Sequence, residues 1–331
     1  MRVAEGTRGE SPLPDAARRG VGRPDGPAGE REAAQHARAS VFDDARPQLF
    51  SVAYRMVGSV ADAEDIVQEA YLRWQEVSGE LRSPRAFLTT IVTRLAINFL
   101  HAARVRREVY VGPWLPEPLA TERTADLSEP LELAESLSMA FLILLERLAP
   151  VERAVLLLHD VFDFEHAEIA RIVDRTEVNC RQLLSRARRH LGSPRRRFEP
   201  DPVEATRLTE AFSSTARTGD VDRMLTVLAK DITLYSDSGG KAGAADRPIH
   251  GAVAVANHIV AALGRFAATS ALRPMRINGE PGLVVYDRAH PVAVLIFDVR
   301  EHRIHQLYAV VNPEKLRNIP HTDRDRTSPV Q

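Results

Sequence analysis

The sequence predicts two all-α domains followed by an α+β domain. In residues 41–107 and 131–192, apolar side chains recur every three to four positions, which is the helical period. From residue 204, two helical stretches give way to short runs of strand-like composition, separated mostly by turns that carry Gly, Pro or Asp. These runs are Ile232–Ser236, Ala271–Ile277, Leu283–Tyr286, Val292–Val299 and Ile304–Val311.

Segments rich in Pro and Gly mark the domain boundaries. Residues 1–40 are one quarter Gly plus Pro and poor in large apolar residues, which predicts a disordered extension. Prolines in residues 108–130 predict a linker, and residues 193–203 predict a short basic hinge. We expect the C-terminal domain at residues 204–316 and a flexible tail at residues 317–331.

The composition limits the class of protein. Hydrophobic residues make up 44% of the chain, and no uninterrupted apolar run reaches the ~18 residues that a membrane-spanning helix needs. The single cysteine, Cys180, excludes an internal disulfide framework and a Cys-based zinc site. We therefore expect a cytoplasmic protein without a membrane partner, a metal ion or a cofactor.

The charges are segregated, although 44 basic and 45 acidic residues leave a net charge of only −1. Arg82–Arg107 holds six arginines and no acid, and Arg181–Arg197 holds seven arginines and no acid. Ser59–Glu80 holds six acids and one arginine. Basic segments attract polyanions, because each neutralised phosphate releases condensed counterions. Two acid-free basic segments on predicted helices favour nucleic-acid binding over an ordinary solvated helix face.

The segment Asp62–Trp74 predicts an amphipathic helix. Its apolar residues follow the spacing i, i+3, i+4, i+7, i+8, i+11, which forms one stripe. The residues off this stripe are Asp62, Asp65, Gln68 and Glu69. For an isolated helix, a solvated acidic face is the alternative interpretation.

A second helix, which is basic, is expected to begin at Ser83-Pro84. Ser can cap a helix, and Pro fits its first turn. The expected buried stripe is Leu88, Ile91, Leu95 and Phe99. The opposite side carries Thr90, Arg94, Asn98 and His101. Arg and Asn on such a face suit contact with phosphates and base edges. The loop Gln75–Arg82, beside Trp74, suits an unstacked base, because every base has a π-face.

Residues 166–191 predict a helix-turn-helix. His166–Val173 is followed by a break at Asp174–Thr176 and by a longer helix at Glu177–Leu191. Cys180 lies on the inward stripe of the longer helix, where a packing role is expected. The outward residues are Asn179, Arg181, Gln182, Ser185, Arg186, Arg188 and Arg189. Early residues of such a helix reach base edges and later ones meet the backbone, so we favour DNA binding over a bundle helix with a basic face.

These segments resemble a known family in order and spacing. Ala61–Trp74 resembles the polymerase-binding helix of sigma-70-type transcription initiation factors of the extracytoplasmic-function group. Ser83–His101 is similar to the minus-ten helix of that group, and His166–Leu191 is similar to its minus-thirty-five helix-turn-helix. The resemblance covers roughly residues 41–192. It implies sigma region 2 at residues 41–107 and sigma region 4 at residues 131–192.

Three further motifs resemble signatures of a subgroup with a fused SnoaL-like (NTF2-like) domain. They are Trp114-Leu115-Pro116-Glu117-Pro118, Asp237-Ser238-Gly239-Gly240-Lys241 and Asn312-Pro313-Glu314-Lys315-Leu316. The resemblance implies an α+β cone at residues 204–316 that tunes the activity of the factor. The chain departs from the family at Ser238, where Gly is usual, and at Arg94 and Asn98, where many members have Asn and Asp. The second departure bears on the preferred promoter sequence and not on the role of the helix.

The resemblance implies a role for each group of residues. The clamp of core RNA polymerase (beta-prime) would contact Asp62, Asp65, Gln68 and Glu69. Minus-ten promoter DNA would contact Trp74, Arg82, Arg94, Asn98, His101, Arg104, Arg106 and Arg107. Minus-thirty-five DNA would contact Arg175, Asn179, Arg181, Gln182, Ser185, Arg186, Arg188 and Arg189. Regulatory contacts within the chain would involve Trp114, Leu115, Pro116, Glu117, Pro118, Asp237, Gly239, Gly240, Lys241, Asn312, Pro313, Lys315 and Leu316.

Two alternatives stay open from the sequence: a SnoaL-like small-molecule enzyme with a DNA-binding arm, and a ligand-responsive regulator that binds DNA by itself. The candidate catalytic residues are Asp237, His258, Tyr286 and Asp298. General acid–base chemistry needs such groups close to a substrate proton, and their spacing does not require it. We therefore expect a sigma factor that is not an enzyme, while an unidentified small ligand of the C-terminal domain stays open.

Overall fold

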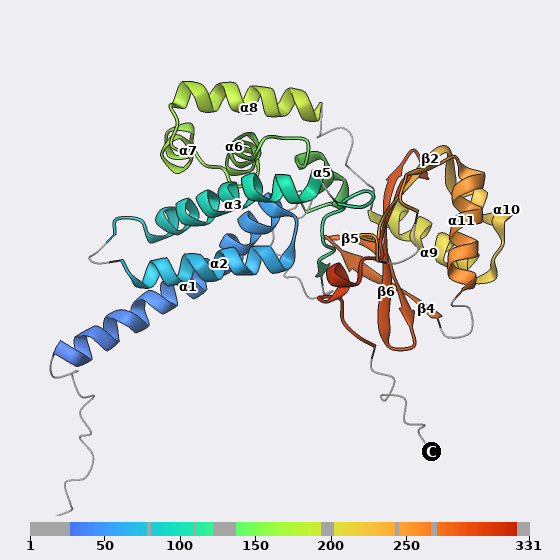
Figure 1. Cartoon of the computed structure of the whole chain (residues 1–331), viewed down its shortest axis with the longest axis horizontal. Helices are drawn as coiled ribbons and strands as arrows, with labels where there is room; N and C mark the ends of the chain where they lie inside the picture. The colour runs from blue at the N-terminus through green and yellow to red at the C-terminus, as the bar shows by residue number, and fades with distance from the viewer. Residues whose placement is uncertain are drawn as a thin grey trace, which may run out of the picture.

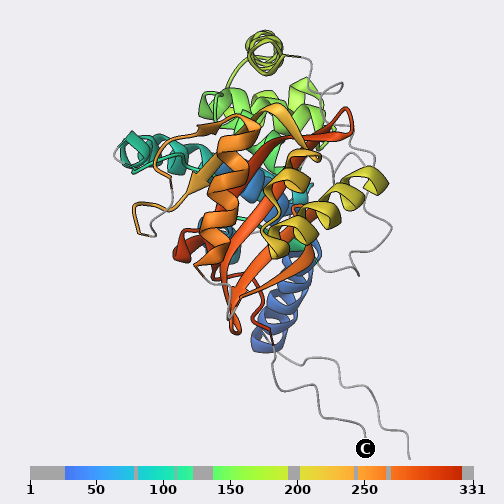
Figure 2. The same ribbon diagram turned by 90° about the vertical axis from the view of Figure 1, so that its right-hand side faces the viewer.

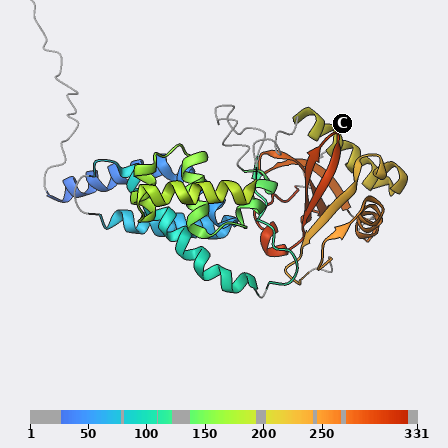
Figure 3. The same cartoon turned by 90° about the horizontal axis from the view of Figure 1, so that it is seen from above.

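A computed structural model describes residues 27–77, 81–108, 110–121, 137–192, 202–241, 245–265 and 270–322. A helical half and a sheet-containing half lie side by side (Figure 1). Seen from above, the yellow-green helix α8 (Glu177–Leu191) lies over the other helices of the helical half (Figure 3). The predicted order of two all-α domains and one α+β domain is thereby confirmed.

The first helical domain contains α1 (Pro27–Val57), α2 (Val60–Gln75) and α3 (Pro84–Glu108). The Ser59 hydroxyl caps α2 by accepting a hydrogen bond from the Asp62 backbone N–H at 3.2 Å. The buried stripe of α2 includes Ala63, Ile66, Val67, Ala70 and Trp74, as predicted, while Tyr71 of the predicted stripe is half-buried. The polar residues that the periodicity placed off this stripe therefore lie on the other side of α2.

The expected disorder of residues 1–40 is wrong for residues 27–40, because α1 begins at Pro27. The indole N–H of Trp74 donates to the Arg38 carbonyl oxygen at 3.0 Å and ties this part of α1 to α2. Low local hydrophobicity could not reveal a helix whose anchor lies 36 positions away. Residues 1–26 lie outside the described residues.

The buried stripe of α3 also differs from the expected one. Its fully buried apolar residues are Leu88, Val92, Ala96, Leu100 and Ala103. Among the expected residues only Leu88 belongs to this set, while Ile91, Leu95 and Phe99 are half-buried. The helix packs against α1 and α2 and also against α6 (Pro150–Asp160) and α7 (His166–Val173), so two sides of it are covered. A single amphipathic stripe could not anticipate the second side.

The second helical domain contains α5 (Met139–Leu145), α6, α7 and α8. The Thr176 hydroxyl caps α8 by accepting from the Asn179 N–H at 3.2 Å. The inward stripe of α8 is also the predicted one: Cys180, Leu184, Ala187 and Leu191. The turn between α7 and α8 contains Asp174 at φ 54°, in the left-handed region that ends a helix.

One hydrophobic core runs through both helical domains. At their junction the buried guanidinium of Arg153 on α6 donates to the Met56 carbonyl oxygen and pairs with Glu146 at 2.8 Å. Residues Pro84–Ala103 of α3 are long and apolar enough to cross a membrane by composition alone. In this structure they pack inside the helical core.

The C-terminal domain combines a curved sheet with three helices. Its helices are α9 (Pro202–Thr218), α10 (Val221–Leu225) and α11 (Ala252–Gly264). Its strands are β2 (Leu228–Asp237), β3 (Ile249–His250), β4 (Ser270–Ile277), β5 (Glu280–Asp287), β6 (His290–Arg300) and β7 (Arg303–Val310). The sheet order is β1-β4-β5-β6-β7-β2-β3, with β2 and β7 parallel. Figure 2 shows the three helices on the face of the sheet turned away from the helical half.

The other face of the sheet packs against the helical half. Leu115 of the linker, Met139 and Ala140 of α5 and Leu316 share a buried cluster with the side chains of that face. The linker also adds a strand, β1 (Ala120–Thr121), to the edge of the sheet beside β4. The linker predicted at 108–130 is thus part of the sheet at residues 120–121, and residues 122–136 lie outside the described residues.

The expected flexible tail is wrong for residues 317–320. Ile319 is buried, the Tyr286 hydroxyl donates to the Pro320 carbonyl oxygen at 2.9 Å, and the Asn318 amide donates to Glu117 at 2.7 Å. These residues follow the short helix η2 (Pro313–Leu316) and close the C-terminal domain against the linker. The polar composition of the segment hid these contacts.

Candidate polymerase and nucleic-acid interfaces

The outer face of α2 carries the four candidate polymerase-binding residues. Asp65 and Gln68 are exposed, while Asp62 and Glu69 are half-exposed. Glu69 pairs with Arg73 one turn along at 2.8 Å. Leu72 lies on the same face, at the i+3 and i+4 positions from Glu69 and Gln68, and is 49% exposed. Sequence analysis missed Leu72, because it considered only the polar residues of this face.

The candidate minus-ten residues divide into three groups. Arg82, Arg94, Asn98 and His101 are exposed, which agrees with a surface role. The side chains of Arg104, Arg106 and Arg107 lie outside the described residues. Trp74 is only 4% exposed and packs against Phe87, so in this structure its side chain is not accessible for the predicted contact with minus-ten DNA. In this structure the Trp74 ring is part of the hydrophobic core beneath α2.

Arg94 makes contacts that the sequence could not reveal. Its Nε donates to the Ile172 carbonyl oxygen at 2.9 Å, and its Nη2 donates to the Arg171 carbonyl oxygen at 3.0 Å. Both acceptors lie at the C-terminal end of α7, where unpaired carbonyls attract a cation. One candidate DNA-binding side chain of the first helical domain is therefore occupied by the second helical domain.

Helix α8 lies at the outer edge of the helical half (Figure 1) and carries the candidate minus-thirty-five residues except Arg175, which lies in the turn before it. Exposed members are Arg175, Arg181, Gln182, Ser185, Arg186, Arg188 and Arg189, and Asn179 is half-buried. Arg188 differs from the others, because its Nε and Nη2 contact Asp160 of α6 at 3.1 and 2.5 Å. Burial alone would raise the pKa of Asp160, but hydrogen bonds from Arg188 and His159 hold it below its ordinary value. Arg188 therefore holds α8 against α6.

The buried carboxylate of Asp237, at the end of β2, gathers the linker and the C-terminal segment. Its Oδ1 accepts from the Tyr110 hydroxyl at 2.5 Å, and its Oδ2 accepts from the Leu115 N–H at 2.8 Å and the Lys315 ammonium at 2.7 Å. Lys315 also donates to the Leu115 carbonyl oxygen at 2.5 Å and lies 4.2 Å from the Trp114 ring centroid. We call this set, Asp237, Tyr110, Trp114, Leu115 and Lys315, the clasp.

Two further features tighten the clasp. Burial and the hydrogen bond to Asp237 raise the pKa of Tyr110, so its hydroxyl stays a proton donor. Gly239 has φ +57°, and a Cβ there would lie 2.6 Å from the Asn312 amide nitrogen and 3.0 Å from the Tyr110 oxygen. Asn312 itself donates to the Tyr110 oxygen at 3.0 Å. The glycine therefore allows the loop after β2 to lie directly on the linker.

Glu117 of the linker anchors the first helical domain. Its buried carboxylate accepts from the Val60 N–H at 2.8 Å at the start of α2 and from the Asn318 amide. Its backbone N–H donates to the Gly58 carbonyl oxygen at 2.8 Å. A carboxylate at a helix N-terminus is favourable, because the unpaired N–H groups there carry partial positive charge. The linker thus joins α2 to the C-terminal domain.

The remaining predicted regulatory residues lie in the same region. Pro116 and Pro118 are buried beside Glu117, and Leu316 is buried in the cluster that contains Leu115. Lys241 pairs with Glu314 at 2.5 Å on the surface. Gly240 packs against Val111, and Pro313 begins η2. The structure brings together the three motifs that the sequence singled out, which lie up to 200 positions apart.

The candidate catalytic residues do not form one site. Asp237 belongs to the clasp, and Tyr286 is buried in the cluster against the helical half. His258 lies on α11, on the opposite side of the sheet, and Asp298 pairs with Arg300 at 2.8 Å. Within the described residues, no group of three or more His, Cys, Asp or Glu side chains is placed to hold a metal ion.

Known proteins share this architecture. Family models for Sigma-70 region 2 and Sigma-70, region 4 match residues 41–106 and 138–191. The ECF RNA polymerase sigma factor SigJ of Mycobacterium tuberculosis is 37% identical over 299 residues, which cover 86% of this chain and 95% of the relative. The chain belongs to the ECF RNA polymerase sigma factors. The probable ECF sigma factor SigI of the same species is 29% identical over 82% of this chain and 92% of the relative.

The similarity to ECF sigma factors includes the C-terminal domain. The crystal structure of M. tuberculosis SigJ matches this chain with a TM-score of 0.67 and 35% identity. The match covers 84% of this chain and 97% of that chain, so the sheet domain is part of the shared fold. The sequence-based family assignment is confirmed, and the two helical domains are from here on region 2 and region 4 of this ECF sigma factor.

Proposed function

We propose that this ECF sigma factor directs transcription initiation at specific promoters and is held inactive by its own C-terminal domain. The clasp on Asp237 carries the proposal. It fixes the linker that connects region 2 to region 4, and regions 2 and 4 are packed together in the same structure. A sigma factor needs these two regions apart when it holds two promoter elements.

Promoter geometry explains why the closed arrangement is inactive. Elements named minus-ten and minus-thirty-five are about 25 base pairs apart, or roughly 85 Å of duplex at about 3.4 Å per base pair. Here the candidate minus-ten residue Arg94 is hydrogen-bonded directly to α7 of the helix-turn-helix. Both DNA-binding surfaces cannot reach their elements until this contact and the shared core between α1, α3 and α6 separate.

The clasp resists that separation through the linker. Asp237 is fully buried and Lys315 is nearly so, so the pair forms in a low-dielectric setting. Loss of one partner would leave a buried charge without compensation, which costs on the order of 3–5 kcal/mol. Glu117 of the same linker is fixed on α2, so residues 110–117 stay attached to both region 2 and the C-terminal domain while the clasp is closed.

The polymerase face of α2 stays accessible in the closed form. Asp65, Gln68 and Leu72 point outwards, so core polymerase, through its beta-prime clamp, can dock before the regions separate. The recognition helix α8 is exposed as well. We infer that the C-terminal domain acts on the opening step rather than by covering the polymerase face, and that the protein works in the cytoplasm without catalysing a reaction.

Transcription in vitro with purified core polymerase tests the proposal. The double variant Asp237→Asn, Lys315→Met opens the clasp without leaving an unpaired buried charge. We expect it to raise promoter-dependent RNA synthesis several-fold over the unmodified chain. Lys230→Met is the matched control, because Lys230 is exposed on β2, outside the clasp and the predicted regulatory contacts, and its loss should leave RNA synthesis unchanged.

Two results would count against the proposal in different ways. Equal or lower RNA synthesis by the clasp variant would contradict inhibition by the C-terminal domain. Absence of promoter-dependent RNA synthesis from the full chain, from the clasp variant and from a chain ending at residue 192 would contradict the sigma function itself.

A further inference from the structure

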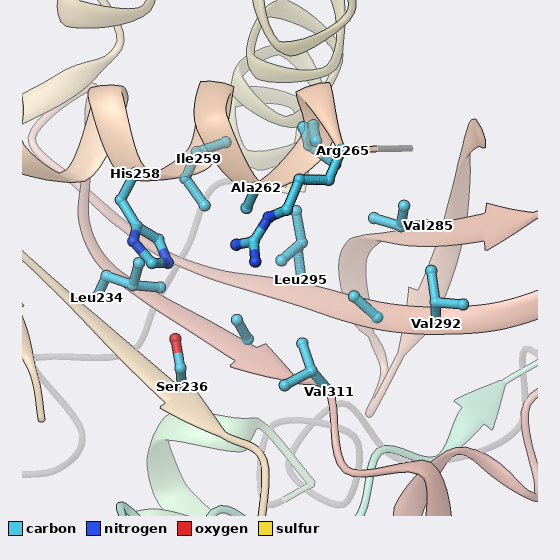
Figure 4. Close-up of a pocket in the computed structure, with 13 residues that line it drawn as sticks. Leu234, Ser236, His258, Ile259, Ala262, Arg265, Val285, Val292, Leu295 and Val311 are labelled. Carbon is cyan, nitrogen blue, oxygen red and sulfur yellow. The ribbon is translucent and has the colours of Figure 1, made fainter. Parts of the chain in front are cut away.

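A cavity of about 160 Å³ lies between α11 and the sheet of the C-terminal domain (Figure 4). It is on the face of the sheet turned away from the clasp. Apolar side chains make most of its wall, among them Leu234, Val285 and Leu295. An apolar cavity of about 150 Å³ can hold one benzene molecule, so this one suits a compact apolar body.

The polar side chains at the cavity are all hydrogen-bond donors or can donate. They are Ser236, His258 and Arg265, and no acidic residue lines the cavity. His258 lies on α11 and Arg265 directly follows the last residue of this helix, and Figure 4 shows the imidazole and the guanidinium over the cavity, directed towards one another. Within the described residues, neither side chain has a hydrogen-bonded or ion-paired partner in the protein.

The electrostatics of the cavity favour an anion. Burial and the nearby charge of Arg265 lower the pKa of His258, so the imidazole is largely neutral at pH 7 and still offers one N–H donor. Arg265 keeps its charge and lies at the exposed edge of the cavity. A carboxylate placed between these groups would form charge-assisted hydrogen bonds, which are stronger than neutral ones.

We propose that this cavity is a binding site for a small organic carboxylate with a compact apolar body, such as an aromatic acid. The carboxylate would lie against Arg265 and His258, and the apolar body would contact Leu234, Val285 and Leu295. A cation would meet Arg265 as a like charge, and a neutral ligand of the same shape would lose the charge-assisted bonds. The site differs from the clasp, the polymerase face and the DNA-binding surfaces.

The cavity adjoins the clasp through the backbone. Ser236, which lines the cavity, directly precedes Asp237, and the N–H of the lining residue Val311 donates to the Asp237 carbonyl oxygen at 2.8 Å. An effect of the ligand on transcription would therefore rest on the proposed function. Binding of the ligand does not depend on the proposed function, so a direct binding measurement on the full chain tests this proposal separately.

Calorimetric titration of the full chain with benzoate tests the site, with benzyl alcohol and benzylamine as neutral and cationic probes of the same ring. We expect benzoate to bind at least about tenfold more tightly than benzyl alcohol, and benzylamine not to bind. Arg265→Gln should weaken benzoate about tenfold and change benzyl alcohol little. Arg247→Gln, which removes an exposed arginine outside the cavity lining, should change neither.

Ala262→Leu, on the cavity wall, should abolish binding of both ligands by filling the space. Thermal melts of each variant verify that the fold is retained. Failure of benzoate to bind at millimolar concentration, or equal binding of benzoate and benzyl alcohol, would overturn the proposal. So would benzoate binding that survives Ala262→Leu, because the ligand would then lie elsewhere.

Discussion

The Asn278 side-chain amide donates a 2.7 Å hydrogen bond to the Tyr54 hydroxyl, and both side chains are fully buried. Tyr54 belongs to α1 of region 2, and Asn278 lies in the turn after β4. The same hydroxyl donates to the Glu117 carbonyl oxygen at 2.6 Å. Region 2, the linker and the C-terminal domain therefore meet at one oxygen atom.

Tyr54→Phe should lower the free energy of unfolding by about 1–3 kcal/mol, because it leaves the Asn278 amide and the Glu117 carbonyl without a buried partner. Denaturation by urea, followed by circular dichroism, measures the change. Tyr71→Phe is the control in the same domain, since Tyr71 is only half-buried and its ring packs on Phe42. A loss no larger than that of the control would show that the three-way junction adds no stability.

Arg94→Gln should populate the open form. The guanidinium bridges two carbonyls of α7, and a glutamine amide cannot reproduce both bonds. Fluorescence energy transfer between dyes on α2 and α8 should report a larger share of molecules with a long distance. Arg175→Gln is the control, because among the described residues the Arg175 side chain donates only to the neighbouring Asp174 carbonyl oxygen. Identical distance distributions for the two variants would show that the Arg94 hydrogen bonds do not hold regions 2 and 4 together.

Leu72→Ser should weaken binding to core polymerase about tenfold, with little loss of stability. Leu72 is 49% exposed and is surrounded by polar candidates on the outer face of α2. Burial of one leucine side chain at an interface contributes roughly 1.5–3 kcal/mol. Biosensor measurements with immobilised core polymerase give the affinity, and Val253→Ser on α11 is a control of similar exposure. Unchanged affinity would remove Leu72 from the interface.

Arg186→Ala and Arg188→Ala should differ, although both residues lie on α8. Arg186 is exposed and forms no ion pair among the residues that the structure describes, whereas Arg188 is held by Asp160. We expect Arg186→Ala to weaken promoter binding and to reduce the salt slope by about 1, as for a phosphate contact. Arg188→Ala should mainly lower the melting temperature. Titrations of promoter duplex at several salt concentrations distinguish the two.

Helical periodicity predicted the buried faces of α2 and α8 closely, because each of these helices buries one face only. The same reasoning misplaced the stripe of α3, which region 4 covers on a second side. Strand-like runs predicted β2 and β4 to β7, but not β1, since two residues of a proline-rich linker carry no strand signal.

For the candidate surfaces too, local features could be predicted from the sequence and contacts between distant residues could not. The three motifs of the clasp were visible as sequences, yet their partner Tyr110 was not, because hydrogen bonds over more than 100 positions leave no local pattern. The contacts of Arg94 are with backbone carbonyls, whose position depends on the fold alone. Trp74 was named as a DNA contact because it adjoins the loop Gln75–Arg82, but it also lies on the apolar stripe of α2, and in the structure it is buried there.

Glu280 should make the stability of the protein depend on pH. It begins β5 near Asp298, and burial, with the Asp298 charge second, raises its pKa from 4.5 to about 8. The folded chain then binds more protons at this site than the unfolded chain between pH 4.5 and about pH 8. Stability from this group is therefore fully present below pH 4.5 and declines as the pH rises to about 8.

Glu280→Gln should remove this decline and stabilise the protein above pH 8, by an amount on the order of 2–4 kcal/mol. Urea denaturation of both proteins from pH 4 to pH 9 isolates the contribution of Glu280, because all other groups titrate in both chains. Glu210→Gln on α9 is the control, since Glu210 is exposed. Parallel stability curves for the unmodified chain and Glu280→Gln would mean that the Glu280 carboxyl ionises in the fold as readily as in the unfolded chain.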